Sequence, residues 1–261
     1  MLDIYYKATE LLREGEDFAI VTVVKAEGSA PREVGTKMIV KKDGKTFGNI
    51  GGDVLEQFAI KEALKVIKVG QSKTVNYVLE EQHKGGIGMR CGGNVDLLIE
   101  STKPPLQLLI IGSGYIANAL AKIGPLVGFS ITVVDPFAQK EDFPDAKKVI
   151  IKDPESGISE VNITSDTYIA VTTRHKYDEL ALKKALESNA TYIGMIGSKN
   201  RVKTAFKTLV NEGVSEKELQ KVYAPIGLDI NAETPEEIAI SVIAEMVKHK
   251  QGGTGESLSS K

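Results

Sequence analysis

The sequence contains little of what several common classes of protein need. Cys91 is the single cysteine among 261 residues, so no disulfide can form within the chain and no cluster of cysteines can hold a metal ion. The 3 histidines, His83, His175 and His249, show no spacing by which histidines bind metals, and we expect them to be structural or at the surface. A lone free thiol is typical of a reducing compartment, so we expect a cytoplasmic protein.

Net charge and long apolar runs are also missing. Lys and Arg total 33 against 35 Asp and Glu, so no overall field attracts nucleic acid or a membrane surface. No apolar run approaches the roughly 18 residues of a membrane span, and the first residues are acidic rather than apolar as in an export signal. No Ser-His-Asp or paired-carboxylate spacing can be argued, and we assign no catalytic residue. We therefore expect a soluble, unexported protein with neither nucleic-acid nor membrane partners.

The stretch Leu106 to Pro136, LQLLIIGSGYIANALAKIGPLVGFSITVVDP, is the strongest pattern that is present. An apolar run enters the turn Gly112-x-Gly114-x-x-Ala117, an apolar helix follows, and a second apolar run ends at Asp135. The first glycine permits a tight turn, the second lets the backbone approach a pyrophosphate, and the alanine allows close packing of helix on strand. A carboxylate at Asp135 would accept hydrogen bonds from ribose hydroxyls, which favours a ribose without a 2′-phosphate. Together these features predict a βαβ unit that binds a nucleotide.

The segment Ser101 to Pro105, STKPP, breaks every periodicity and is the expected domain boundary. We predict an α/β protein, with an N-terminal α+β domain over residues 1–102 and a Rossmann-like, doubly wound parallel-sheet domain over residues 103–250. Residues 251–261 have little apolar content, and we expect a disordered tail. Outside the βαβ unit, the expected helices cover residues 3–14, 53–69, 176–188, 198–212, 215–221 and 235–249, and the expected strands residues 18–26, 74–79, 95–100, 147–152, 167–173 and 190–197.

Two shorter signals refine these elements. Lys42-Asp43-Gly44-Lys45 separates two strand-like runs and predicts a β-hairpin, and hence an antiparallel sheet. Thr234-Pro235-Glu236-Glu237 is typical of a helix N-terminus, since Thr can cap, Pro suits the first turn and Glu237 completes a capping box.

Three loops of the N-terminal half combine glycines with charged or sulfur side chains. They are Gly28-Ser29-Ala30-Pro31-Arg32, Gly51-Gly52-Asp53 leading to Glu56, and Gly85 to Gly93, which includes Arg90, Cys91 and Gly92. Successive glycines form concavities of backbone amides that bind anions, and an arginine adds a bidentate phosphate contact. A thiol among such groups is favoured as thiolate, a nucleophile or a ligand of a soft metal. Alternatively, the glycines only make turns and Cys91 is a small buried hydrophobe.

Two further segments follow predicted strands of the C-terminal half, where doubly wound sheets bind ligands. Thr172-Thr173-Arg174-His175 follows one strand, and Gly194-Met195-Ile196-Gly197-Ser198-Lys199-Asn200-Arg201 follows the next. In the second segment Ser198 can cap a helix while Lys199 and Arg201 bind a phosphate. An ordinary capped helix with solvated basic residues is the alternative.

Seven blocks of the chain, in this order, resemble the XdhC/CoxI family, the accessory factors of xanthine dehydrogenase and related molybdenum hydroxylases. The resemblance extends from about Leu11 to Val247. The blocks are GSAPREVGTKM (28–38), GNIGGDVLE (48–56), CGGNVDLLIE (91–100), LLIIGSGYIANAL (108–120), TTRHKYD (172–178), YIGMIGSKNR (192–201) and APIGLDINAETPEEIAISVIAEM (224–246).

The resemblance implies a non-catalytic chaperone with a C-terminal Rossmann domain. Such a protein binds molybdenum cofactor, as molybdopterin or its dinucleotide form, assists its sulfuration and helps insert it into a molybdenum hydroxylase apo-enzyme. The family implies a homodimer, and a cysteine desulfurase is a further candidate partner. Cys91 would contact the molybdenum or its sulfur, Arg32 and nearby glycine amides the pterin and phosphate, and the Gly112 fingerprint a nucleotide. The candidate cofactor-binding residues are Gly28, Ser29, Arg32, Gly51, Gly52, Glu56, Arg90, Cys91, Gly92, Gly93, Gly112, Gly114, Tyr115, Asp135, Arg174, Ser198 and Arg201.

The sequence departs from the family pattern at two positions and leaves two other functions open. Asp53 stands where the family usually has a third glycine, and a carboxylate there would repel a phosphate or recruit a cation. Tyr115 stands where the family often has histidine. An NAD-dependent oxidoreductase fits the fingerprint and Asp135, although no proton-transfer pair can be argued from spacing. A Rossmann-type regulator that senses a ligand is the third possibility.

Overall fold

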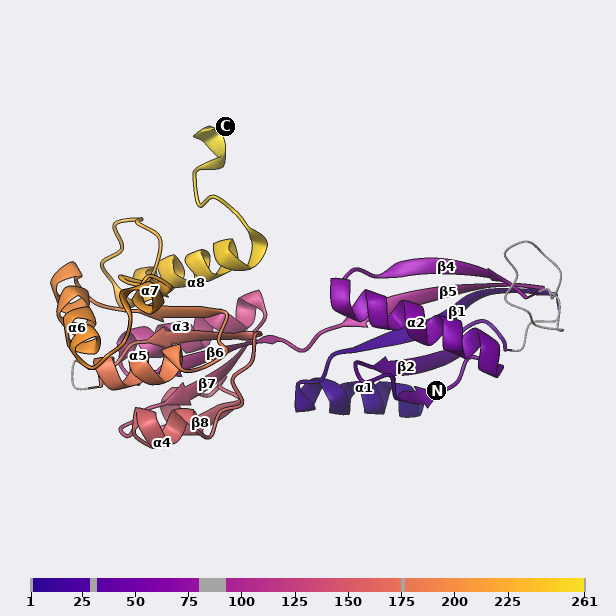
Figure 1. Cartoon of the computed structure of the whole chain (residues 1–261), viewed down its shortest axis with the longest axis horizontal. Helices are drawn as coiled ribbons and strands as arrows, with labels where there is room; N and C mark the ends of the chain where they lie inside the picture. The colour runs from indigo at the N-terminus through magenta and orange to yellow at the C-terminus, as the bar shows by residue number, and fades with distance from the viewer. Residues whose placement is uncertain (1, 29–31, 80–92, 175–176, 261) are drawn as a thin grey trace. The chain divides into compact units, whose positions relative to one another are not determined.

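The computed structural model describes residues 2–28, 32–79, 93–174 and 177–260, and the chain divides into two compact units, Met1–Pro105 and Leu106–Lys261 (Figure 1). None of the helices in these described ranges is long and apolar enough to cross a membrane.

The N-terminal unit is an antiparallel sheet with a helix on each face. Its strands are β1 (Phe18–Gly28), β2 (Lys37–Lys41), β3 (Thr46–Gly48), β4 (Lys73–Val78) and β5 (Gly93–Thr102), in the order β3-β2-β1-β5-β4. Successive strand residues point to opposite faces. Ala19 and Val21 therefore pack in one core cluster with α2 (Asp53–Val69), whereas Phe18 packs with α1 (Leu2–Glu14). The predicted hairpin forms between β2 and β3, where Gly44 has a φ of 83°.

The C-terminal unit is a parallel sheet covered on both faces. Its strands are β6 (Leu106–Ile111), β7 (Phe129–Val134), β8 (Lys148–Ile150), β9 (Thr167–Val171), β10 (Tyr192–Met195) and β11 (Val222–Tyr223), and neighbouring strands pair in parallel. Their spatial order, β11-β10-β9-β6-β7-β8, is that of a Rossmann fold. This confirms the predicted fold class.

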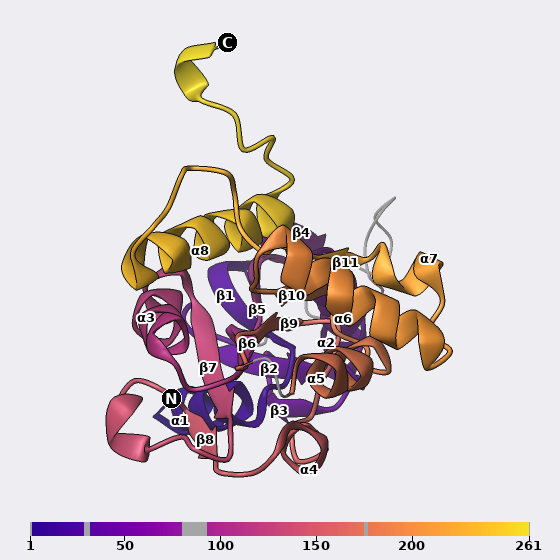
Figure 2. The ribbon, with the colours of Figure 1, turned by 90° about the vertical axis from the view of Figure 1, so that its left-hand side faces the viewer.

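Helices of the C-terminal unit are shared between the two faces of this sheet, as Figure 2 shows. One core cluster contains buried residues of α3 (Tyr115–Ile123) and α8 (Pro235–Gln251). The other contains buried residues of α4 (Pro154–Ile158), α5 (Asp178–Leu186), α6 (Lys199–Asn211) and α7 (Glu216–Leu219). The sequence did not predict α4 and β11, because 5 and 2 residues are too few to show a periodicity. Short 3-10 helices cover Gly124–Val127, Lys140–Asp142 and, in the C-terminal tail, Leu258–Ser260.

The capping box predicted for α8 is present. Thr234 Oγ1 accepts a hydrogen bond from the amide of Glu237 at 3.2 Å, and Glu237 Oε2 accepts from the amides of Thr234 at 3.0 Å and Glu233 at 2.9 Å. These amides hold the pKa of Glu237 below its usual value. Because the folded pKa is lowered, the contribution of this carboxylate is present above the unfolded-state pKa of about 4.3 and is lost as the pH falls through the folded value.

We therefore expect the Thr234→Ala variant to lower the free energy of unfolding by about 1 kcal/mol at neutral pH. Urea unfolding at pH 7 measures this. The two amides that donate to the Glu237 carboxylate belong to the backbone and stay in place in the variant, so both proteins should lose stability in acid by a similar amount. Thr204→Ala is the matched control, because Thr204 is an exposed residue inside α6 where alanine is the better helix former. Equal losses for both variants would contradict the assigned cap.

Candidate functional site

The carboxyl edge of the parallel sheet is the first candidate site. Strand β6 lies between β7 and β9, so the strand order reverses at this position, and ligands of doubly wound sheets bind outside the strand ends at such a switch point. Gly112 follows β6 and Thr172 follows β9. The amide of Thr172 donates to Ile111 O at 2.8 Å, and its Oγ1 donates to the same oxygen at 3.1 Å. The two predicted ligand-binding segments after β6 and β9 therefore lie side by side.

The two fingerprint glycines differ in what surrounds them. Gly112 has a φ of 127°, and a Cβ there would lie 2.6 Å from both the carbonyl oxygen and Oγ1 of Thr172. Gly114 is the N-cap of α3 with a φ of −75°, and a Cβ there would meet nothing within 4 Å. The chain therefore needs Gly112 for its own packing, whereas Gly114 borders open space that a ligand can enter. Ala117, predicted to pack against the sheet, is fully buried.

Asp135 lies at the end of β7, beside the fingerprint turn, since the amide of Gly112 donates to Val134 O at 2.9 Å. Its side chain is buried at 7% exposure, and Oδ1 accepts a hydrogen bond from the amide of Phe137 at 2.7 Å. No residue in the described ranges is bonded to its Oδ2. Tyr115, at the start of α3, is 85% exposed. One carboxylate oxygen and the open approach over Gly114 are therefore what this edge offers to a ribose and a pyrophosphate.

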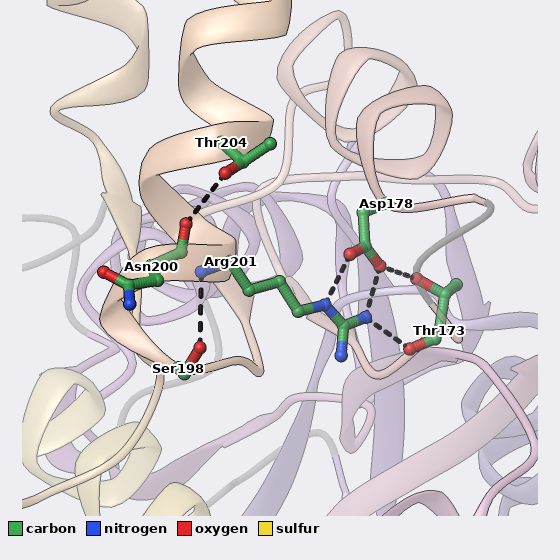
Figure 3. A network of polar contacts seen from close by, with 6 residues as sticks. All are labelled: Thr173, Asp178, Ser198, Asn200, Arg201 and Thr204. Carbon is green, nitrogen blue, oxygen red and sulfur yellow. Dashed lines mark hydrogen bonds and ion pairs between the residues drawn. The ribbon is translucent and has the colours of Figure 1, made fainter.

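Arg201 is held inside the C-terminal unit, as Figure 3 shows. Its Nε lies 2.6 Å from Asp178 Oδ2, and its Nη2 donates to Asp178 Oδ1 and to Thr173 O, both at 2.7 Å. Ser198 caps α6 by accepting from the Arg201 amide at 3.3 Å, as the sequence predicted. Only Nη1 of the guanidinium lacks a partner among the residues that the structure describes, so most of this side chain is engaged within the protein. Arg174, which follows Thr173 in the sequence, is exposed.

One end of the N-terminal sheet is the second candidate site. Gly28, the last residue of β1, pairs with Gly93, the first residue of β5. Arg32 Nε donates to Asn49 Oδ1 at 3.0 Å, which joins the loop after β1 to the loop before α2. Gly28 of the first glycine-rich loop thus lies beside Gly93 of the third, and Arg32 is bonded to the segment that leads into the second.

Glu56 occupies the glycine loop before α2. Its Oε1 accepts hydrogen bonds from the amides of Ile50 and Gly51, each at 3.2 Å. Gly51 and Gly52 have φ values of 98° and 67°, and Gly52 caps α2 without a side-chain hydrogen bond. The amide of Gly51, which the sequence suggested for an anion, therefore already faces a carboxylate of the protein, and an anion there would compete with Glu56.

Four candidate residues, Ser29, Arg90, Cys91 and Gly92, lie outside the described residues. In the described ranges, no group of three or more His, Cys, Asp and Glu side chains could hold a metal ion. The predicted contact between Cys91 and molybdenum stays a prediction.

Sequence reasoning missed Asp178 and Asn49 as parts of these sites. Asp178 begins α5, where an acidic residue is common for helix stability alone, so its pattern gave no reason to expect a buried partner. Its place in the block TTRHKYD was the one available signal.

Comparisons with known proteins match both units. The XdhC Rossmann domain family matches residues 108–246, and the XdhC and CoxI family matches residues 11–78. The uncharacterized protein YqeB of Escherichia coli K12 is 29% identical over 97% of the chain, which spans only 47% of the length of YqeB. A probable xanthine dehydrogenase subunit of Bacillus subtilis 168 is 23% identical over 92% of the chain and 96% of its own length.

Two further matches extend over nearly the whole chain. The molybdenum cofactor insertion chaperone PaoD of Escherichia coli K12 is 23% identical over 92% of the chain and 85% of its own length. A crystal structure of a xanthine dehydrogenase from Bacillus halodurans has a TM-score of 0.53 and 23% identity, covering 97% of this chain and 98% of that one. At this identity the structural match shows the fold alone.

Proposed function

Because the chain belongs to the XdhC and CoxI family, whose Rossmann domain alone matches residues 108–246, we propose that it is an accessory protein that binds molybdenum cofactor and helps insert it into a molybdenum hydroxylase apo-enzyme. The observation that carries the proposal is the similarity to the insertion chaperone PaoD, which extends over 92% of the chain and so includes both units.

The N-terminal glycine loops are the proposed site for the pterin and its phosphate. Arg32 is exposed and bonded to Asn49, and its guanidinium is the proposed contact to the phosphate. Cys91 is the proposed contact to the molybdenum or its sulfur, since a thiolate is a soft ligand. A role in sulfuration, with a cysteine desulfurase as donor, belongs to the same proposal.

The carboxyl edge of the parallel sheet is the proposed nucleotide site. The nucleotide is either free or part of the dinucleotide form of the cofactor. Gly114 and the N-terminus of α3 receive its pyrophosphate, and Asp135 receives its ribose hydroxyls. We further propose that the protein is a cytoplasmic homodimer.

A protection and transfer experiment tests the function. Molybdenum cofactor released from a denatured molybdenum enzyme is incubated in air with the chain, then mixed with a hydroxylase apo-enzyme whose recovered activity is measured. We expect the wild type to prolong the time during which the cofactor can still be transferred, and Cys91→Ser to lose this protection.

The single cysteine supplies the control. Alkylation of the wild type with iodoacetamide modifies one thiol and should reproduce the Cys91→Ser result, whereas alkylation of Cys91→Ser itself should change nothing further. Failure of the wild type to protect would contradict the chaperone function. Full protection by Cys91→Ser would contradict only the role of the thiol.

Oδ2 of Asp135, to which none of the described residues is bonded, also favours a second candidate, an NAD-dependent oxidoreductase, and the same site suits a ligand-sensing regulator. Thermal shift with molybdopterin, its cytosine dinucleotide, NAD and NADP separates these functions, because a ligand at about 100 times its dissociation constant stabilises by roughly 2.7 kcal/mol. A shift with NAD alone, together with substrate-dependent NAD reduction, would favour the oxidoreductase. Ligand-dependent partner binding without cofactor transfer would favour the regulator.

A further inference from the structure

Both side chains of the ion pair between Asp178 and Arg201 are largely shielded from water. The Asp178 side chain is 3% exposed and the Arg201 side chain 18%. A carboxylate in such a position must be paired and hydrogen-bonded, and the two parallel contacts at 2.6 and 2.7 Å fix the guanidinium in orientation as well as position. The pair therefore fixes the position of the residues that are bonded to it.

The loop after β9 is attached to this pair by two contacts. Thr173 O accepts from Arg201 Nη2 at 2.7 Å, and Thr173 Oγ1 donates to Asp178 Oδ1 (Figure 3). The preceding residue, Thr172, is bonded to Ile111 at the end of β6. A continuous set of contacts thus leads from α6, through the first residue of α5, to the fingerprint turn.

The residues at the start of α6 allow the Arg201 side chain to reach Asp178. A Cβ on Gly197 would lie 3.1 Å from Arg201 Cδ, so the absence of a side chain leaves room for the arginine. Ser198 then caps the helix through the Arg201 amide. The basic residues of this segment suggest a phosphate contact. One of them, Arg201, instead has Asp178 as its partner within the protein.

We propose that Asp178 and Arg201 are a positioning pair of the nucleotide site. They hold Thr172 to Arg174 at the switch point, so that Thr172 stays against the fingerprint turn and the exposed Arg174 is available to the phosphate of a nucleotide. The proposal rests on the nucleotide-binding part of the proposed function. Arg201 acts through this loop rather than by touching the ligand.

The test measures the dissociation constants of NAD and of cytidine 5′-diphosphate by calorimetry on the full chain, well below its melting temperature. Asp178→Asn and Arg201→Lys each remove the bidentate geometry, because a lysine cannot reproduce the planar fork. We expect both to weaken the binding of whichever probe the wild type binds by about tenfold, since the loop must then be ordered on binding. Hydrogen exchange of the Thr172–Arg174 amides should become faster in both variants.

Two controls separate positioning from stability. Lys183→Met removes another ion pair that joins α5 to the end of α6, Lys183–Glu212 at 3.0 Å, without touching the loop. Val202→Ala truncates a buried side chain of α6 and destabilises the same helix. Both controls should leave the dissociation constants unchanged, even where the melting temperature falls.

The outcomes distinguish the two claims. A wild type that binds neither probe contradicts the nucleotide-binding part of the proposed function and removes the basis of the positioning role. A wild type that binds, with Asp178→Asn and Arg201→Lys binding equally well, overturns the positioning role alone. Weakening by Val202→Ala as large as that by Asp178→Asn overturns it too, because the pair would then act only through stability.

Discussion

The Gly112→Ala variant is expected to destabilise the C-terminal unit by about 3 kcal/mol and to lose nucleotide binding. The added Cβ would lie 2.6 Å from the carbonyl oxygen of Thr172, and the φ of 127° is one that alanine rarely adopts. Relief requires the loop after β9 to move away from β6, which opens the switch point. Urea unfolding and calorimetry with NAD and cytidine 5′-diphosphate measure the two effects.

Gly114→Ala is the matched control for this prediction. Its φ of −75° suits alanine and its Cβ would meet nothing within 4 Å, so stability should change by less than about 1 kcal/mol. Nucleotide binding should nevertheless weaken, because the methyl group occupies the space through which a pyrophosphate approaches. Wild-type stability of Gly112→Ala would refute the described packing, and wild-type affinity of Gly114→Ala would place the ligand elsewhere.

Arg201→Met is expected to lower the free energy of unfolding by about 3–5 kcal/mol, because it leaves the buried carboxylate of Asp178 without its partner. The double variant Asp178→Leu with Arg201→Met removes both charges and should recover much of this loss, since the cost lies in the unpaired charge. Denaturant unfolding of Asp178→Leu, Arg201→Met and the double variant measures the coupling free energy between the two side chains.

The exposed pair Lys183–Glu212 is the control for this second prediction. Its side chains are 39% and 45% exposed, and such pairs contribute about 0–1 kcal/mol. Lys183→Met and Glu212→Gln should therefore unfold close to the wild type. If breaking either ion pair lowered the free energy of unfolding by a similar amount, the greater burial of the Asp178–Arg201 pair would have no energetic effect, and the prediction would be wrong.

The fold was predictable because its main signals are local. The run from Leu106 to Pro136 contains strand, turn, helix and strand in order, and the capping pattern Thr234-Pro235-Glu236-Glu237 marks the start of α8 within four residues. The strand order around β6 agrees with the doubly wound sheet that the sequence predicted. By contrast, α4 and β11 are stabilised by tertiary packing, and their few residues carry no periodicity.

The sites were predictable only in part, since contacts between distant residues decide them. A basic residue after a capping serine has the same local pattern whether it binds phosphate or an internal carboxylate, and the partner of Arg201 lies 23 positions earlier in the chain. Glu56 likewise looked like a ligand-binding residue, yet its carboxylate accepts from Ile50 and Gly51. The proximity of Gly28 and Gly93 depends on the β1–β5 pairing, which no single loop reveals.

Binding of molybdenum cofactor by the purified chain is the central claim, and its most direct test is to measure the pterin and molybdenum that the chain retains after gel filtration under anaerobic conditions. We expect the wild type to retain pterin and molybdenum in equal amounts, and Cys91→Ser to retain less molybdenum. A wild type that retains neither, while NAD alone raises its melting temperature, would contradict the proposed function.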